Sequence, residues 1–338
     1  MLTGGWIACA TTAGNGARLG APAPAIDYDR WLRPAVVDVP TKGPSPIRVV
    51  QFFAGWSEPC VRSIPMLSEL QTEFAAEGVE LLAVTAPDTK NSLDLMLDLL
   101  ERRSGQLDYG FVWDADGSTL ARWLGPDGQR ALPVAFVTDR EGRIVYRGHP
   151  RWLRAPIEGL VQGDWDLELG NAALARAEAE WNALYRASGE PDRVVALARA
   201  FRERYPRVAE SVDAFEFEAL LELDRGRQAA TVAHRMIERG IQRRDALLLN
   251  NTAWSMVDPY RRLGYRDLDL AYKAARTAVS LTAETDPYLL DTLARVHAWR
   301  GEFVEAHAYQ TKAVALAKDA PGLVEALDEY RRRLRDRR

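Results

Sequence analysis

The most informative shortage in this 338-residue chain is cysteine, of which there are only two, Cys9 and Cys60. Two cysteines exclude a disulfide-stapled fold, and nothing in the sequence supports a bridge between them. Histidine is also scarce, and the four histidines lack the spacing of metal ligands, so we expect no metal site. The sequence has no Gly-rich phosphate loop and no Gly-x-Ser-x-Gly motif, and we expect no cofactor.

Long apolar runs and a strong excess of one charge are missing too. No run approaches the roughly 20 apolar residues that a membrane-spanning helix needs, so we expect no membrane span. A formal net charge of −4 and a pI near 5.8 argue against nucleic acid as a partner. Six arginines stand in residues 331–338, which we interpret as a solvated helix end. The length suits about two domains.

Residues 1–19 are expected to form a signal-peptide-like or disordered leader. The run MLTGGWIACATTAGNG is small and apolar, like the end of a secretory signal without its basic start. This predicts an extracytoplasmic location, periplasmic or secreted, with a cytoplasmic location as the alternative. Cys9 is a candidate for lipid attachment, but Trp6 and Ile7 fit that motif poorly.

The most distinctive pattern is IRVVQFFAGWSEPCVRSIP, residues 47–65. Residues 48–53 are β-branched and aromatic with almost no polar break, which predicts a buried strand. Ser57 suits the N-cap of a following helix, and Glu58 and Pro59 suit its first turn in charge and in fixed φ. The segment therefore predicts a strand, a tight turn and a helix.

A strand, a Trp-x-x-Pro-Cys turn and a helix with Pro65 five residues past Cys60 resemble the active-site segment of the thioredoxin fold. The family's redox motif is Trp-Cys-x-Pro-Cys, and here Ser57 replaces its first cysteine. In that motif the first thiolate attacks the substrate disulfide and the second cysteine resolves the mixed disulfide. A serine hydroxyl cannot take the first role, and Cys60 keeps the resolving position, where burial would raise its pKa.

A proline directly before the apolar residues 134–138 extends the resemblance. Thioredoxin-fold proteins keep a cis-proline there, facing the active-site turn, and the neighbouring backbone pairs with an extended peptide. A trans-proline opening a strand is the structural alternative. The resemblance implies that residues 48–53 and 134–138 are adjacent strands, and that a peptide groove is formed by Trp56, Ser57, Glu58, Pro59, Leu132 and Pro133.

The opening at residues 20–32, G-x-P-A-P-x-x-D…W-L, is similar to that of extracytoplasmic thiol-disulfide reductases of the TlpA type. Residues 79–85, VELLAVT, predict a second buried strand, and a strand–helix–strand unit of this length implies a right-handed parallel crossover. We expect the thioredoxin-like α/β domain to cover residues 20–168.

In residues 169–338 alanine, leucine, arginine and glutamate dominate and strand patterns are missing, so we expect an all-α domain there. A pattern recurs after 35 residues, in which Leu268, Ala271, Ala278, Val279 and Leu281 return as Phe303, Ala306, Ala313, Val314 and Leu316. A six-residue insertion lies near Pro259–Tyr265 in the preceding unit. Small alanines where paired helices cross, at this period, resemble the tetratricopeptide repeat.

Together these features predict a redox-inactive protein-binding or scaffold protein with protein or extended-peptide partners, and they do not indicate an oligomeric state. The alternative is an oxidoreductase or peroxidase that acts through Cys60 alone. Peroxiredoxins carry Pro-x-x-x-Thr/Ser-x-x-Cys, and Ser57-Glu-Pro-Cys60 fits its last four positions. However, Phe53 stands where that motif has its proline, and no arginine lies just inside the strand after Pro133.

Overall fold

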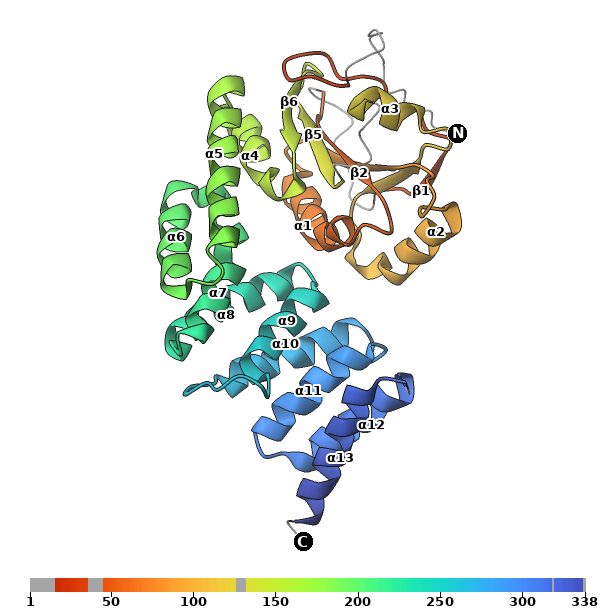
Figure 1. The fold of residues 1–338 in the computed structure, drawn as a ribbon. Coiled ribbons are helices and arrows are strands. Elements are labelled where there is room, and N and C mark those ends of the chain that lie inside the picture. The colour runs from red at the N-terminus through yellow and green to blue at the C-terminus, as the bar shows by residue number, and fades with distance from the viewer. Residues whose placement is uncertain (1–15, 36–44, 126–131, 318, 337–338) are drawn as a thin grey trace. The chain divides into compact units, whose positions relative to one another are not determined.

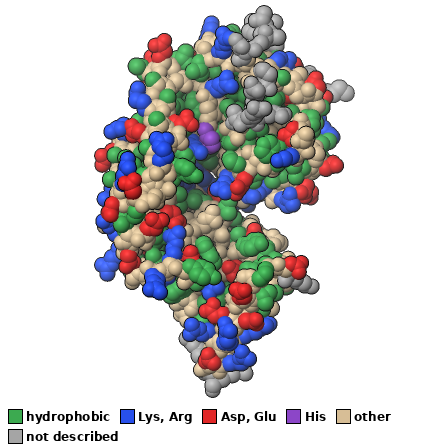
Figure 2. All heavy atoms as spheres, viewed as in Figure 1, with side chains coloured by type: hydrophobic (Ala, Val, Ile, Leu, Met, Phe, Trp, Pro, Cys, Tyr) green, Lys and Arg blue, Asp and Glu red, His purple; other side chains and the backbone are tan. Residues whose placement is uncertain are grey.

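The computed structural model describes residues 16–35, 45–125, 132–317 and 319–336 (Figure 1). The chain divides into two compact units at residues 178 and 179, inside helix α5 (Leu167–Arg186). The first unit is α/β, and the second holds helices and no strand among its described residues, as the sequence predicts. None of the helices described is both long and apolar enough to cross a membrane. On the face seen in Figure 2, acidic and basic side chains lie interspersed.

A mixed six-stranded sheet forms the centre of the first unit, in the order β1-β4-β3-β2-β5-β6. The strands are β1 (Arg30–Arg33), β2 (Ile47–Phe53), β3 (Val79–Thr85), β4 (Gly110–Trp113), β5 (Val134–Thr138) and β6 (Ile144–Gly148). β3 runs parallel to β2 and β4, while β5 runs antiparallel to β2 and β6, and β1 antiparallel to β4. The predicted parallel crossover and the adjacency of residues 48–53 and 134–138 are confirmed.

Successive side chains of β2 point to opposite faces of the sheet, and they are buried on both. Both faces of the sheet are therefore covered. Phe52 is fully buried, with its ring centroid 5.9 Å from that of Trp123. Phe53 points the other way, and its ring lies 5.3 Å from that of Phe111. The helices of this unit that precede α5 are α1 (Glu58–Phe74), α2 (Leu93–Arg102), α3 (Ser118–Leu124) and α4 (Arg154–Gln162).

The segment before β1 runs along the outer edge of β6. Gly20 N donates to Ile144 O at 2.7 Å, Ile144 N to Ala21 O at 2.9 Å, and Ala23 N to Gly142 O at 2.9 Å. Ala17, which the sequence assigns to the leader, is also buried in the core of this unit. Packing of the first unit therefore extends back to residue 17, while Cys9 lies outside the described residues.

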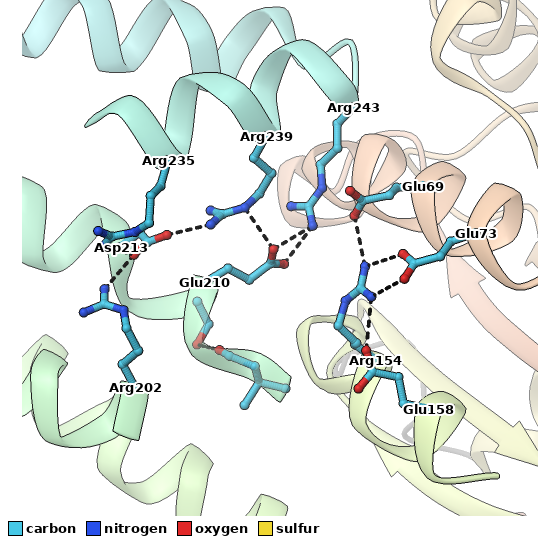
Figure 3. Close-up of polar contacts among 12 residues, drawn as sticks. Glu69, Glu73, Arg154, Glu158, Arg202, Glu210, Asp213, Arg235, Arg239 and Arg243 are labelled. Atoms are coloured by element: carbon cyan, nitrogen blue, oxygen red, sulfur yellow. Dashed lines mark hydrogen bonds and ion pairs between the residues drawn. The ribbon is translucent and has the colours of Figure 1, made fainter. Parts of the chain in front are cut away.

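One arginine joins α4 to α1 (Figure 3). The Arg154 guanidinium lies 2.8 Å from the Glu73 carboxylate, 3.3 Å from that of Glu69 and 3.2 Å from that of Glu158. It also lies over the ring of Phe74, 5.8 Å from its centroid. These contacts fix the start of α4 on α1, the helix that carries the Trp-x-x-Pro-Cys turn.

The second unit is built from consecutive helices that pack against their neighbours in the chain. They are α6 (Pro191–Arg204), α7 (Asp213–Glu222), α8 (Gly226–Gln242), α9 (Ala246–Val257), α10 (Leu268–Leu281), α11 (Pro287–Trp299), α12 (Phe303–Leu316) and α13 (Pro321–Arg335). The alanines singled out by the repeat, Ala271, Ala278, Ala306 and Ala313, are all fully buried. The six-residue insertion lies in the connection between α9 and α10.

A buried aspartate joins α6, α7 and α8 (Figure 3). Asp213 accepts hydrogen bonds from Arg202 at 2.6 Å, Arg235 at 3.0 Å and Arg239 at 2.6 Å. Burial acts to raise the pKa of Asp213, but the hydrogen bonds and charges of these arginines outweigh it and hold the pKa below its usual range. The carboxylate is therefore charged at neutral pH and forms ion pairs with arginines of α6 and α8.

Candidate functional site

The turn between β2 and α1 places Ser57 at the helix N-cap, as predicted. Its backbone is extended, its N–H donates to Ala54 O at 3.0 Å, and its carbonyl accepts from Val61 N at 3.1 Å. The hydroxyl makes no capping hydrogen bond to the helix backbone and lies instead in hydrogen-bonding contact with the Cys60 thiol. Ser57 is only 4% exposed, so its hydroxyl faces the protein interior.

Cys60 is a free thiol in the first turn of α1 and is fully buried. Burial raises the pKa of this thiol, and the opposing hydrogen bonds from the Ser57 side chain and the Ala54 backbone do not cancel the effect. The thiol is therefore neutral at physiological pH, as the sequence predicts for the resolving position. A neutral, buried thiol is a poor nucleophile.

Three buried polar residues near Cys60, Gln51, Ser63 and Tyr109, were not found by sequence analysis. Gln51 Nε2 donates to Ser63 Oγ at 2.9 Å, and Ser63 Oγ donates to the carbonyl of Cys60 at 2.6 Å. Tyr109 is fully buried, and burial, together with the charge of a Cys60 thiolate, raises the pKa of its phenol. Gln51 could have been noticed as the polar residue within an apolar strand, whereas Tyr109 gave no signal.

Trp56 is held at the surface by the loop between β3 and α2. Its indole is 44% exposed, and Nε1 donates to Asp88 Oδ2 at 2.8 Å. Asp88 Oδ1 accepts from the backbone N–H of Lys90 at 2.6 Å and of Asn91 at 2.8 Å, and the Lys90 ammonium lies 5.8 Å from the indole centroid. Asn91 Oδ1 in turn accepts from Gly55 N at 2.8 Å. This loop therefore fixes both the turn and the tryptophan.

Glu58 and Pro59 are exposed at the start of α1. The Glu58 carboxylate forms an ion pair with Arg62, one helical turn further on. Neither side chain contributes to the core, and the two residues follow Trp56 and Ser57 in the chain. The two residues are thus available on the surface of the turn.

The Leu132–Pro133 peptide is cis. Val134 is paired with Phe52 across the antiparallel β5–β2 ladder, so Pro133 stands opposite the end of β2, where the Trp56 turn begins. Leu132 is half-buried against the core and Pro133 is buried. The structure therefore brings the predicted proline and the predicted turn to one edge of the sheet.

Comparison with known proteins supports the same assignment of fold. Residues 39–147 match the family model described as the AhpC/TSA family. The chain is 28% identical to protein FixW of Rhizobium leguminosarum over 44% of its own length and 67% of FixW. It is 25% identical to the thiol-disulfide oxidoreductase ResA of Bacillus cereus, over 33% of this chain and 60% of ResA. The first unit has a thioredoxin-like α/β fold.

Similar solved structures are more distant. A secreted disulfide oxidoreductase of Mycobacterium tuberculosis is 18% identical, with a TM-score of 0.26 over 31% of this chain and 69% of that one. A thioredoxin-family thiol:disulfide interchange protein of Chlorobium tepidum is 20% identical, with a TM-score of 0.27 over 30% and 68%. The chain thus spans about 60% of the ResA relative and about two thirds of these structures.

Proposed function

We propose that this chain is a redox-inactive, thioredoxin-like protein that binds an extended segment of a protein partner. One observation carries the proposal: the single cysteine of the turn, Cys60, is a buried thiol of raised pKa, and Ser57 occupies the nucleophile's position. The surface proposed for the partner consists of the exposed side chains of Trp56, Glu58 and Pro59, together with the backbone of Ser57, Leu132 and Pro133.

Dithiol–disulfide exchange needs a thiolate to attack one sulfur of the substrate and a second thiol to displace the mixed disulfide. At position 57 the attacking group would be a neutral hydroxyl that is turned toward Cys60. Cys60 would then have to act alone, from a position with no exposed surface. This turn therefore supplies neither the attacking thiolate nor an accessible second thiol.

Peptide binding has better support. The half-exposed Trp56 is anchored by Asp88, so an incoming chain meets an aromatic surface that is already ordered. Pro133 stands at the same edge of the sheet, and the backbone before β5 is the segment to which an extended chain could add as a strand.

We further propose that the helical unit is a tetratricopeptide-like array with a second interaction surface. The full burial of Ala271, Ala278, Ala306 and Ala313 in paired helices supports this, because small side chains allow helices to cross closely. We also propose an extracytoplasmic location, for which the signal-like composition of residues 1–15 is the support.

The alternative function, a thiol-dependent oxidoreductase or peroxidase acting through Cys60, is favoured by the match to the AhpC/TSA family. It requires a thiolate that peroxide or a disulfide can reach. The burial of Cys60 and the direction of its pKa shift weigh against that requirement.

Thiol labelling distinguishes these functions in a Cys9→Ser background, in which Cys60 is the single thiol. We expect iodoacetamide to label Cys60 of the folded protein slowly at pH 7, and quickly after the addition of denaturant. Insulin disulfides and hydrogen peroxide should both remain unconsumed. Rapid labelling of the folded protein, with turnover of either substrate, would assign the catalytic role to Cys60.

A further inference from the structure

The helical unit contains a large pocket that is open to solvent, called the cavity below, between α9, α11 and α13. Its volume is about 1110 Å³, and it is also bordered by the connections before α10 and before α13. Small-molecule sites typically measure about 300–1,000 Å³ and enclose most of their ligand. The size of this cavity therefore suits several residues of a polypeptide better than a metabolite.

The insertion found in the sequence forms one wall of this cavity and holds an aromatic side chain there. Tyr260 lines the cavity and is 90% exposed. Its loop is fixed because Arg261 pairs with Glu218 at 2.6 Å and Arg266 donates to Met256 O at 2.6 Å. The Arg266 guanidinium also stacks on Trp299, 4.1 Å from the ring centroid. The loop is thus held in place by these contacts and exposes the Tyr260 ring to the cavity.

A second aromatic side chain comes from the first turn of α11. Tyr288 lines the cavity and is 62% exposed, and Leu316 at the end of α12 is 51% exposed. Large apolar side chains exposed together on fixed elements are typical of binding surfaces, where aromatic residues supply much of the affinity. These three side chains offer apolar anchoring points.

The charged residues that line the cavity are mainly acidic. Among its described lining residues are four carboxylates and two guanidinium groups: Asp291, Asp319, Glu325, Glu329, Arg295 and Arg332. Arg295 is already paired with Glu329 at 3.0 Å, and burial raises the pKa of Asp291. Asp319 and Glu325 are exposed. Arg332 is the exposed cation among the described lining residues, and the two exposed carboxylates outnumber it, so the rim favours a cationic ligand.

We propose that this cavity binds a peptide segment of a protein partner in which lysine or arginine side chains flank an aromatic or aliphatic one. The apolar side chain packs between Tyr260, Tyr288 and Leu316, and the cations face Asp319 and Glu325. This assignment rests on the proposed second interaction surface of the helical unit and gives its partner a chemical class.

Two fluorescein-labelled, end-capped peptides test the assignment with the full chain. Both contain the same leucine and tyrosine residues, and the remaining positions are all lysine in one and all glutamate in the other. We expect fluorescence anisotropy to show at least about tenfold tighter binding of the lysine peptide at about 0.01 M salt, with a smaller preference at about 1 M. Equal affinity for the two peptides overturns the assignment.

Exposed substitutions locate the binding without threatening the fold. We expect Tyr260→Ala and Glu325→Lys each to weaken binding of the lysine peptide about fivefold or more. The matched controls Tyr185→Ala and Glu203→Lys lie outside the cavity lining, on exposed positions of α5 and α6, and should leave binding unchanged. Unchanged binding in both cavity variants would overturn the assignment.

Three further outcomes separate this inference from the proposed function. If Trp56→Ala alone removes binding, the lysine peptide occupies the thioredoxin-like unit, and the inference fails while the proposed function stands. If sedimentation shows that Tyr260→Ala dissolves a self-associated form of the chain, the cavity holds a second copy and the inference also fails. Disulfide reductase activity of the natural chain would refute the proposed redox inactivity and leave the peptide measurements untouched.

Discussion

The indole nitrogen of Trp56 donates a hydrogen bond to Oδ2 of Asp88 at 2.8 Å, although 32 residues separate them in the chain. The other oxygen of Asp88 accepts the backbone N–H groups of Lys90 and Asn91. A single carboxylate therefore orders the loop after β3 and fixes the exposed ring on the neighbouring turn. The surface proposed for the peptide is organised before any partner arrives.

Replacing Asp88 by alanine should loosen both elements at once. We expect the free energy of unfolding to fall by about 1–3 kcal/mol, because three hydrogen bonds lose their acceptor. Urea unfolding measures this change. Lys90→Ala is the matched control: it removes only the exposed cation near the Trp56 ring and should cost less than about 1 kcal/mol. Equal losses in the two variants would contradict an organising role for Asp88.

Ser57→Cys should restore a Trp-Cys-x-Pro-Cys turn. In the Cys9→Ser background we expect the introduced thiol to titrate below the free-thiol value of about 8.5, because it stands at the N-terminus of α1. It should form a bridge with Cys60 and confer insulin reductase activity, which we do not expect of the parent. Mass spectrometry after oxidation measures the bridge. A variant whose two cysteines never join would show that the turn has diverged from the redox geometry.

Ala306→Leu tests the packing of the helical repeat. Ala306 is fully buried, so three added carbon atoms must displace neighbouring helices, and we expect a loss of stability of about 1–3 kcal/mol. Ala308→Leu is the control, since Ala308 lies on the same helix and is exposed. Thermal unfolding that is equally unchanged in both variants would show that the proposed repeat register is wrong.

Asp213→Asn should destabilise the helical unit by about 1–3 kcal/mol at neutral pH, because three partly exposed arginines lose the buried carboxylate that they share. Glu210 and Glu216 remain beside these arginines as counter-charges, which limits the loss. The pKa of Asp213 is lowered in the folded protein, so its contribution is complete above the unfolded value of about 3.9 and is lost as pH falls through the folded pKa. The difference between the natural chain and the variant should therefore shrink in acid.

Denaturant unfolding of both proteins across this pH range measures the effect. Asp192→Asn is the control, because the Asp192 carboxylate is exposed where it pairs with Arg225, and its loss should cost less than about 1 kcal/mol. A difference for Asp213→Asn that stays constant down to the lowest pH would mean that charge is not what the three arginines recognise.

The features that sequence analysis found are those encoded by neighbouring residues. Ser57 at the N-cap, the buried Cys60 and the strand after Pro133 each follow from local pattern and a known motif order. Helix α5 begins at Leu167, two residues before the expected start of the all-α domain at residue 169, which is a small difference of the usual kind at helix ends.

The features that it missed depend on chain segments that meet only after folding. Asp88 and Asn91 stand in an ordinary polar loop, and nothing in their spacing from Trp56 indicates a contact. Asp213 and its arginines are 11 to 26 residues apart, on three helices, and such ion pairs follow no period in the sequence. Secondary structure can be predicted from local pattern, whereas these contacts require the tertiary arrangement.

The backbone of residues 20–23 along β6 also bears on solubility. An unpaired outer strand offers a row of free N–H and C=O groups onto which another polypeptide can stack, and aggregation starts at such templates. The hydrogen bonds from Gly20, to Ala21 and from Ala23 occupy part of that row with the chain's own backbone. Proteolysis just before Gly20 would leave these hydrogen bonds in place. A cut after Ala23 would free the edge of β6 for pairing with another chain, with no change in the helices.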